Sequence, residues 1–332
     1  MSKIYTYVTR GKNTECVHEV KCLIKNIKNE TIFSTNNLHD VIFPRSSIKI
    51  FQAIPFITSR ADKIFKLNQK QIALACASHT GQNFHILQLS SWVDKLKINK
   101  ENLQCGIHSP INSESTNKLL LSGNQPNQLH NNCAGKHLAM LSSSIVNCYK
   151  INDYLDLNHP HQIKIREILK NFTESNIVKT NYGVDGCSAP QYAFTINNLS
   201  TALINLIKSF KKKDLYTSEI RTLVASILCN PNMIGGSYRF DTDLIKIFNS
   251  NLFCKGGAEG VFLFAHLKKN IVGVIKVKDG NERAIPSTVF QLFKKLKIAT
   301  KQESAKLKRW EEIKIKNHAK TITGKIYSII KT

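Results

Sequence analysis

The chain has 332 residues, of which 42% are hydrophobic, enough to bury the core of one large domain or two small ones. The 47 Lys and Arg residues exceed the 23 Asp and Glu residues and give a net charge of +24, a charge that in principle suits nucleic acid. The basic residues are scattered along the sequence, so the composition excludes a disordered chain and does not predict a specific nucleic-acid-binding protein.

The cysteine content and the hydropathy pattern bear on the location of the protein. Nine cysteines occur without an apolar leader segment at the start, so we expect a cytoplasmic protein with reduced thiols. Apolar runs do not reach the roughly 18 residues that a membrane-spanning helix needs, and we therefore expect no membrane partner.

The first 24 residues have the alternating pattern of strands. Residues 4–8 and 16–24 alternate between apolar and polar side chains, and Arg10, Gly11, Lys12 and Asn13 between them favour a turn. The segment predicts an antiparallel hairpin.

Ser46 and Lys49 follow an extended stretch that ends at Pro44. A serine in this position is a good N-cap, so we expect a helix to begin at Ser46 and to carry Lys49 one turn later on the same face. A serine with a lysine three residues later can act as a nucleophile with its base. The alternative is an ordinary N-cap serine followed by a solvated lysine.

The middle of the chain has the spacing of amphipathic helices, interrupted by polar clusters. Helices are expected over residues 84–96, 138–145, 160–172, 199–210 and 220–228. Polar clusters rich in turn-forming residues lie at 78–81, 130–137 and 182–190. Such clusters between helices are where binding and catalytic side chains are commonly found.

The last 80 residues again predict strands. Residues 261–267 and 271–277 form an expected antiparallel pair, with Lys255 just before it, and a helix over 289–296 precedes closing strands at 313–315 and 321–330. We therefore predict an α+β fold in which the terminal strands share one antiparallel sheet with helices packed on it. We expect a single domain over 1–332, with a helical middle at 46–250 between terminal strands at 1–40 and 255–332.

Stretches spread over nearly the whole chain resemble the asparaginase II family of rhizobial type, whose fold is similar to those of serine β-lactamases and penicillin-binding proteins. These stretches are residues 8–11, the Ser46 segment, 76–81, 106–110, 130–137, 185–187, 239–242 and 255–261. The resemblance implies hydrolysis of the side-chain amide of L-asparagine to L-aspartate and ammonia, by a homodimer. Its two catalytic pairs are Ser46 with Lys49 and Ser78 with Lys255, and its expected substrate-binding residues are Arg45, His79, Asp185 and His137.

The same resemblance implies a zinc site at Cys133, Lys136 and Cys187. Zinc usually takes sulfur, imidazole or carboxylate ligands, so a lysine ligand must be neutral and is unusual. Because the Ser-Lys pairs already supply a nucleophile and a base, we expect the metal to position the substrate and not to generate a hydroxide. The alternative is that both cysteines are small buried core residues.

Three positions depart from the family pattern. Ile50 stands where proline is usual, Gln82 where glutamate is usual, and Ser188 where glycine is usual. The change at Gln82 removes a charge near Ser78.

Other functions stay open at this point. The substrate could be glutamine or an acyl donor of the penicillin type, although a cytoplasmic location disfavours cell-wall peptides. A basic nucleic-acid-binding protein fits the charge but lacks a recognisable motif, and a structural zinc protein would want a fourth ligand.

Overall fold

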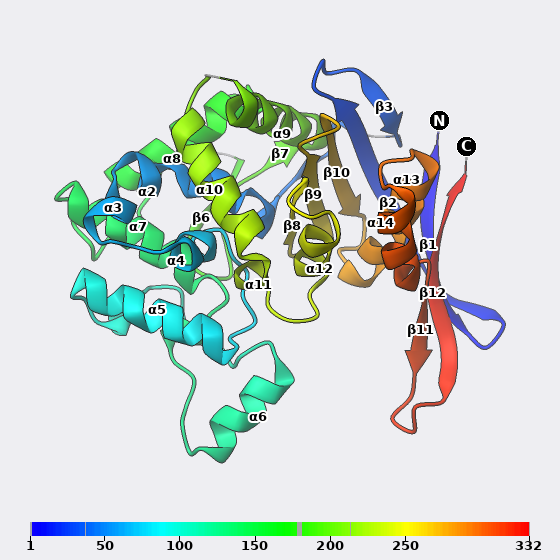
Figure 1. Cartoon of the computed structure of the whole chain (residues 1–332), viewed down its shortest axis with the longest axis horizontal. Helices are drawn as coiled ribbons and strands as arrows, with labels where there is room; N and C mark the ends of the chain where they lie inside the picture. Colours follow the sequence, from blue (N-terminus) through cyan, green and yellow to red (C-terminus); the bar gives the residue numbers. More distant parts are fainter. Residues whose placement is uncertain (1, 37, 178–180, 213, 332) are drawn as a thin grey trace. The chain divides into compact units, whose positions relative to one another are not determined.

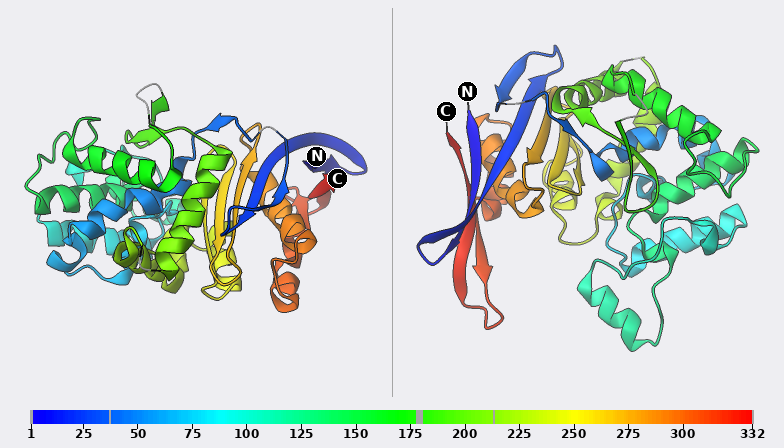
Figure 2. Two further views of the ribbon diagram at one scale, coloured as in Figure 1. Left: turned by 90° about the horizontal axis from the view of Figure 1, so that it is seen from above. Right: turned by 180° about the vertical axis from the view of Figure 1, so that it is seen from behind.

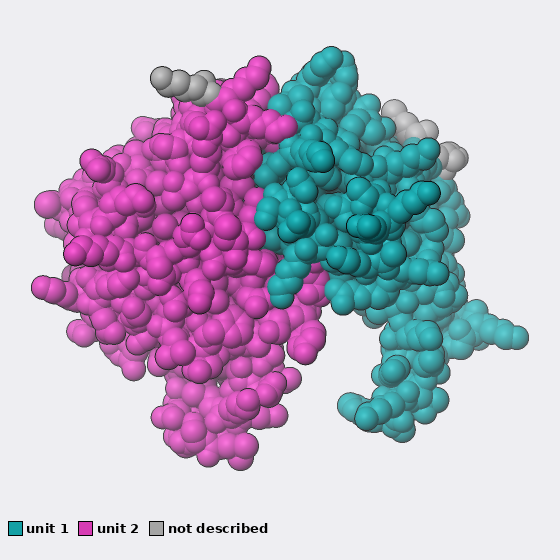
Figure 3. Space-filling model, viewed as in Figure 1, with its two compact units in different colours: residues 1–47, 194–204, 244–332 teal, residues 48–193, 205–243 magenta. Residues whose placement is uncertain are grey.

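The computed structural model describes residues 2–36, 38–177, 181–212 and 214–331. Its contacts divide the chain into two compact units. Unit 1 comprises residues 1–47, 194–204 and 244–332, and unit 2 comprises residues 48–193 and 205–243 (Figure 3). The sequence predicted a single domain over 1–332, and the division into two units does not test that prediction.

Unit 1 is built on an eight-stranded antiparallel sheet. Seven of its strands follow the order β11-β12-β1-β2-β10-β9-β8, and β3 pairs with β2. The strands are β1 (Lys3–Arg10), β2 (Asn13–Asn26), β3 (Thr31–Ser34), β8 (Leu252–Gly257), β9 (Val261–His266), β10 (Ile271–Val277), β11 (Glu312–Lys316) and β12 (Ile322–Lys331). Figures 1 and 2 show β1 and β12 side by side, which confirms that the terminal strands share one sheet.

Helix α13 (Ile285–Lys295) packs on this sheet and is followed by α14 (Lys301–Leu307). Every second residue of β1 is buried, and among them the hydroxyl of Thr6 lies 3.1 Å from that of Thr288 on α13 and 2.7 Å from that of Ser328 on β12. These buried hydroxyls satisfy one another, so the contact carries no unpaired polar group. The α+β class predicted from the sequence is confirmed.

The remaining elements of unit 1 are short. Strands β4 (Val41–Ile42) and β7 (Phe194–Thr195) form a separate antiparallel pair. The 3-10 helices are η1 (Arg45–Ile48), whose last residue belongs to unit 2, η5 (Glu282–Ala284) and η6 (Lys308–Trp310).

Unit 2 is mainly helical. Its helices are α1 (Lys49–Gln52), α2 (Ile54–Thr58), α3 (Ala61–Ile64), α4 (Gln69–Leu74), α5 (Asn83–Leu96), α6 (Ser113–Leu121), α7 (Ala134–Val146), α8 (Pro160–Thr173), α10 (Thr217–Cys229) and α11 (Pro231–Ile234). It also has η2 (Lys100–Asn102), η3 (Gln128–His130) and a hairpin of β5 (Tyr182–Val184) and β6 (Pro190–Tyr192). Helices α9 (Ile196–Lys211) and α12 (Phe240–Ile247) run from one unit into the other.

Helix α7 is the centre of unit 2. It packs against α2, α3, α4, α5 and α8, and every residue from Ala134 to Ser144 is buried. Its serine hydroxyls are hydrogen-bonded: that of Ser142 donates to Leu138 O at 2.7 Å and accepts from Trp92 Nε1 at 3.0 Å. Hydrogen-bonded hydroxyls are what a helix needs in a buried position.

Most of the expected elements are confirmed, and the differences fall at the polar segments. Ser46 does not cap a helix, because residues 45–48 form η1 and α1 begins only at Lys49. The expected loop at 182–190 is instead the β5–β6 hairpin with its turn, and Lys255 lies inside a strand, β8, and not before one. In the described part of the chain, helices combining the length and apolar character needed to cross a membrane are absent.

His161 on α8 gives the fold a pH dependence. The residue is fully buried, and burial, together with the nearby His159 and Lys164, lowers its pKa to about 3. The folded state therefore keeps a neutral ring while the unfolded state binds a proton below its ordinary pKa near 6.5. Stability from this group is complete above that value and is lost as the pH falls toward 3.

We predict that His161→Phe reduces the loss of unfolding free energy between pH 6.5 and 3 by roughly 2–4 kcal/mol. Urea unfolding at several pH values measures the slope of the unfolding free energy against pH. A packing cost of the new ring that does not depend on pH leaves this slope unchanged. The matched control is His318→Phe at an exposed histidine, which should leave the slope unchanged. Equal slopes for wild type and His161→Phe would contradict the prediction.

Candidate active site

Lys49, the first residue of α1, has a buried amine with several partners. Its side chain is 0% exposed, and its Nζ contacts Ala77 O, Ser78 Oγ at 3.3 Å and Cys133 Sγ at 3.2 Å. A buried amine is tolerated only when its N–H groups are satisfied, and these atoms satisfy them. Within unit 2 the structure places Ser78 beside Lys49, and the pairing of Ser78 with Lys255 that the family resemblance implied stays a prediction.

The loop that carries Ser78 is fixed by the segment after α10. Ser78 N donates to Ile234 O at 2.8 Å, and Ser237 N donates to Gln82 Oε1 at 2.8 Å. The Gln82 amide also donates to Ser237 Oγ at 3.3 Å, which the glutamate usual at this position could not do. The glutamine that departs from the family pattern is thus hydrogen-bonded to Ser237. Because Ser78 N donates to Ile234 O, this N–H cannot also bind a reacting oxygen.

Cys133, Lys136 and Cys187, the three residues that the family resemblance implies for a zinc site, lie close together. Cys133 precedes α7 and Lys136 lies one turn later, so both side chains share one face of the first turn. Lys136 Nζ donates to Cys187 Sγ at 3.1 Å, and the Cys133 thiol is hydrogen-bonded to Cys187.

The charges in this cluster are unequal. The hydrogen bond from Cys133, assisted by Lys136, lowers the pKa of Cys187 to about 4, whereas the same bond and burial raise that of Cys133 to about 12. Burial alone would lower the pKa of Lys136, but electrostatic attraction, chiefly to Cys187 and with Asp185 contributing, outweighs it and raises the pKa. Cys187 and Lys136 therefore form a buried thiolate–ammonium pair.

Two contacts set the position of the first turn of α7. Asn131 Oδ1 accepts from Cys133 N at 2.9 Å, and its Nδ2 donates to Cys105 O at 2.7 Å. Gly135 faces the end of α4, where an added Cβ would lie 2.1 Å from Leu74 O. This close approach brings the residues that follow α4 to the thiol cluster.

His79 and His137 each present a buried ring nitrogen. Nδ1 of His79 accepts from Gly81 N at 3.2 Å, and Nδ1 of His137 lies 2.6 Å from the Tyr154 hydroxyl, which itself accepts from Gln104 N. In His79 Nε2 then carries the proton, and in His137 it does so in the tautomer in which the Tyr154 hydroxyl donates to Nδ1. Neither Nε2 has a hydrogen-bond partner in the described part of the chain.

The charge states of these rings follow from their burial. Burial lowers the pKa of His137 to about 3 and, with His85 and Lys49, that of His79 well below its ordinary value. Both are neutral donors, which suits their expected role toward a substrate.

Asp185 lies in the turn of the β5–β6 hairpin. Its backbone closes the turn with Ala189 and Ser188, and its carboxylate accepts from Gly186 N at 2.8 Å. Ser188 has a φ of +66°, a left-handed conformation that explains why glycine is usual at this position. Ile50, the third departure, is buried in α1.

Ser46, Arg45 and Lys255 belong to unit 1. Lys255 lies on the edge strand β8, is 3% exposed, and donates to Gly256 O at 2.9 Å. A Cβ added at Gly257 of that strand would lie 2.4 Å from Pro44 O and 3.4 Å from Ser46 N, so the Ser46 backbone packs directly on β8. Arg45 reaches Glu259 at 3.9 Å. The pairing of Ser46 with Lys49 stays a prediction.

The cluster at Cys133 fits zinc in its donor types. Among the described residues, groups of three His, Cys, Asp or Glu side chains arranged to hold a metal are absent, so a metal here would have to use Lys136. Two thiolates and a neutral amine are suitable zinc donors, provided that binding displaces the protons of Lys136 and Cys133.

Sequence reasoning missed the residues that hold the site. Asn131 and Gly135 lie within the polar cluster at 130–137, but only their contacts with Cys105 and Leu74 reveal their roles. Tyr154, the partner of His137, has no local signal in the sequence.

Comparison with known proteins identifies one family. The sequence model of the family described as L-asparaginase II matches residues 6–328. A search of curated proteins gives no match. A solved structure from Bacteroides dorei DSM 17855, with a provisional beta-lactamase name, is 9% identical, covers 88% of this chain and 93% of its own, and has a TM-score of 0.38. A likeness this weak supports no conclusion.

We predict that Gly135→Ala lowers the unfolding free energy by roughly 1–3 kcal/mol, because α7 must move away from the Leu74 carbonyl. Denaturant unfolding measures the loss. As a control, Gly106→Ala adds a methyl group with no other atom within 4 Å, so its only cost is the strain of an alanine at a φ of +76°. A smaller loss for Gly135→Ala than for Gly106→Ala would count against this packing.

Proposed function

The chain belongs to the L-asparaginase II family, and from this premise we propose that it hydrolyses the side-chain amide of L-asparagine to L-aspartate and ammonia through a serine nucleophile activated by a buried lysine. The family makes it an asparaginase-type amidohydrolase. The substrate and the Ser-Lys mechanism are the proposed part.

The observation that carries the proposal is the contact between Lys49 and Ser78. A serine hydroxyl is a weak nucleophile until a base accepts its proton, and the buried Lys49 Nζ lies 3.3 Å from the Oγ of the half-buried Ser78. In apo structures such distances are often slightly longer than in the reacting complex. Ser46 with Lys255 supplies the second serine and lysine expected of the family.

The proposed reaction has two halves. The serine oxygen attacks the amide carbon while Lys49, in its neutral form, takes the hydroxyl proton. The tetrahedral intermediate expels ammonia, which receives that proton and leaves an acyl-enzyme ester. The same lysine then takes a proton from water as the water oxygen attacks the ester, and it returns this proton to the departing serine oxygen, which releases aspartate and restores the neutral amine and the serine hydroxyl. Removal of either the serine or the lysine should stop both halves.

We propose that two charged residues and the two neutral histidines bind the α-ammonium and α-carboxylate groups of the substrate. A carboxylate such as Asp185 suits the α-ammonium group, and a guanidinium such as Arg45 suits the α-carboxylate. The unpartnered Nε2–H groups of His79 and His137 can donate to substrate oxygens. The homodimer and the cytoplasmic location stay predictions.

Zinc, held by Cys133, Lys136 and Cys187, would supply a Lewis acid that orients a polar group of the substrate. When zinc is absent, the Cys187 thiolate is neutralised by the Lys136 ammonium. The cluster and the Lys49 amine share Cys133, so binding of zinc there would also order Lys49.

We predict that Lys49→Met abolishes ammonia release from L-asparagine, because the variant fills the same space without a base. Ser78→Ala and Ser46→Ala separate the two hydroxyls: the variant that loses acyl-enzyme formation, detected by mass spectrometry of the trapped intermediate, carries the nucleophile. Because Lys49 contacts Ser78, the larger loss is expected for Ser78→Ala.

Ser47→Ala is the matched control, since the Ser47 hydroxyl donates to Pro44 O at 2.7 Å and faces no catalytic group. Full activity in Lys49→Met would refute the mechanism. Faster hydrolysis of glutamine than of asparagine by wild type would refute the substrate and keep the mechanism.

We also predict that Cys133→Ser and Cys187→Ser each lower the zinc content of the purified protein. The exposed Cys148 and Cys229 provide controls, because Cys148→Ser and Cys229→Ser should keep it. Elemental analysis measures the metal directly. If zinc positions the substrate, chelation raises KM more than it lowers kcat. Equal zinc in all four variants would place the metal elsewhere.

A further inference from the structure

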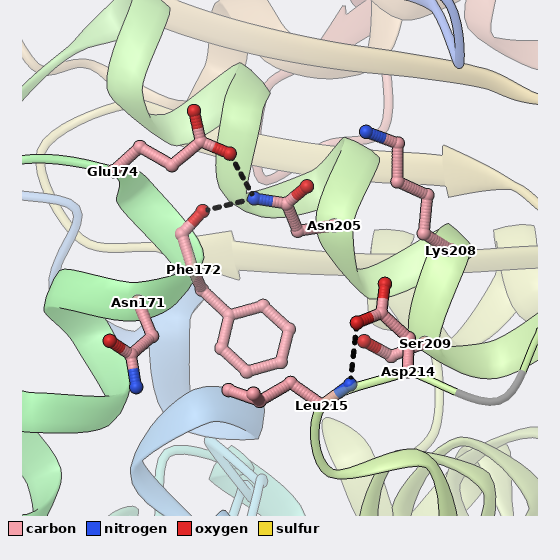
Figure 4. A pocket seen from close by; sticks show the side chains of 8 residues that line it. All are labelled: Asn171, Phe172, Glu174, Asn205, Lys208, Ser209, Asp214 and Leu215. Atoms are coloured by element: carbon pink, nitrogen blue, oxygen red, sulfur yellow. Dashed lines mark hydrogen bonds between the residues drawn. The ribbon is translucent and has the colours of Figure 1, made fainter.

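Unit 2 contains a cavity whose lining includes none of the residues discussed above. It lies at the end of α8 and α9 and before α10, and its volume is about 400 Å³ (Figure 4). The lining residues are Asn171, Phe172, Glu174, Asn205, Lys208, Ser209, Asp214 and Leu215. This volume is within the range of small-molecule sites.

The cavity carries charges of both signs that lack ionic partners. In the described part of the chain, the amine of Lys208 has no hydrogen-bond or ion-pair partner. Among the described residues, the Glu174 carboxylate accepts from the Asn205 amide at 3.0 Å, and that of Asp214 accepts from Leu215 N at 2.7 Å. Two carboxylates of exposed residues and one amine therefore line the cavity, and none of the three forms an ion pair with another described residue.

Ser209 adds a buried polar group. The residue is 2% exposed and lines the cavity, and its hydroxyl has no hydrogen-bond partner among the residues that the structure describes. A ligand acceptor or donor that enters the cavity can form a hydrogen bond with this hydroxyl.

The backbone also favours a cation on one side of the cavity. Glu174 is the left-handed C-cap of α8, and Lys208 and Ser209 lie in the last turn of α9. The carbonyl ends of helices carry partial negative charge, so an ammonium group is stabilised beside Glu174. The apolar surface comes from Phe172 and the exposed Leu215 (Figure 4).

From these groups we infer that the cavity is a binding site for a free α-amino acid with an apolar side chain. Its α-ammonium lies against Glu174, its α-carboxylate accepts from Lys208 and Ser209, and its side chain covers Phe172 and Leu215 (Figure 4). A zwitterion matches the lining better than a simple cation, because a cation leaves Lys208 and Ser209 unpaired. The site does not depend on the proposed hydrolysis.

Calorimetric titration of the full chain with L-leucine tests the inference, since leucine has no side-chain amide to hydrolyse. Two leucine analogues report on its charges: 3-methylbutylamine lacks the carboxylate and 4-methylpentanoate lacks the ammonium. Each analogue should bind at least about tenfold more weakly than leucine, which corresponds to the loss of one charged contact.

Two variants locate the binding. Lys208→Met should weaken leucine binding at least about tenfold. Glu174→Gln should weaken it similarly while keeping an acceptor for Asn205. Lys170→Met is the control, because Lys170 is an exposed lysine in the last turn of α8 outside the cavity.

Several results would overturn the inference. They are the absence of leucine binding up to roughly 10 mM, equal binding of 3-methylbutylamine, and unchanged binding in both Lys208→Met and Glu174→Gln. Loss of asparagine hydrolysis in Lys49→Met leaves the leucine result unaffected, so failure of this inference and failure of the proposed function are distinguishable.

Discussion

The buried amine of Lys49 is the constraint on which the site in unit 2 depends. It has no solvent contact, so its N–H groups must find partners in the protein, and they find the Ala77 carbonyl, Ser78 and Cys133. These partners come from segments 28 to 84 residues away along the chain. Satisfying one polar group thus fixes the separation of a serine, a lysine and a thiol.

That convergence is possible because α7 begins very close to the end of α4. Gly135 allows the Leu74 carbonyl to approach the helix, and Asn131 holds the backbone of Cys133 from the other side. Both contacts act on the backbone, so they position Cys133 and Lys136 without relying on flexible side chains. The first turn of α7 is therefore a rigid support of the kind a precise site requires.

The thiol–lysine cluster resolves an electrostatic problem of burial. A lone ammonium at Lys136 or a lone thiolate at Cys187 would be costly, but at 3.1 Å the two charges stabilise each other. Cys133 completes the arrangement by donating its thiol hydrogen to Cys187. The same sulfur and nitrogen atoms could bind a metal ion after losing their protons. Both the ion pair and a metal site therefore need these atoms to lie close together.

The order of strands and helices was largely accessible from the sequence. Alternation in residues 4–8 and 16–24 marked β1 and β2, and apolar spacing marked α5, α8, α9 and α10, because these patterns reflect which face of an element is buried. The polar segments were less predictable. Residues 45–48 form a 3-10 turn and not a helix start, since the Ser47 side chain and backbone both bond to Pro44 O.

The sequence by itself determined which chemical groups this protein has: two serines, three lysines and two cysteines in motifs that resemble one family. Only the tertiary structure decided which of them meet. It placed Lys49 beside Ser78 and the backbone of Ser46 against β8, the strand of Lys255. Spacing had suggested Ser46 with Lys49 and the family resemblance had implied Ser78 with Lys255, and both of these pairings stay predictions. Spacing along a helix reports only local neighbours, whereas the partners of a buried amine are set by whichever distant segments packing brings to it.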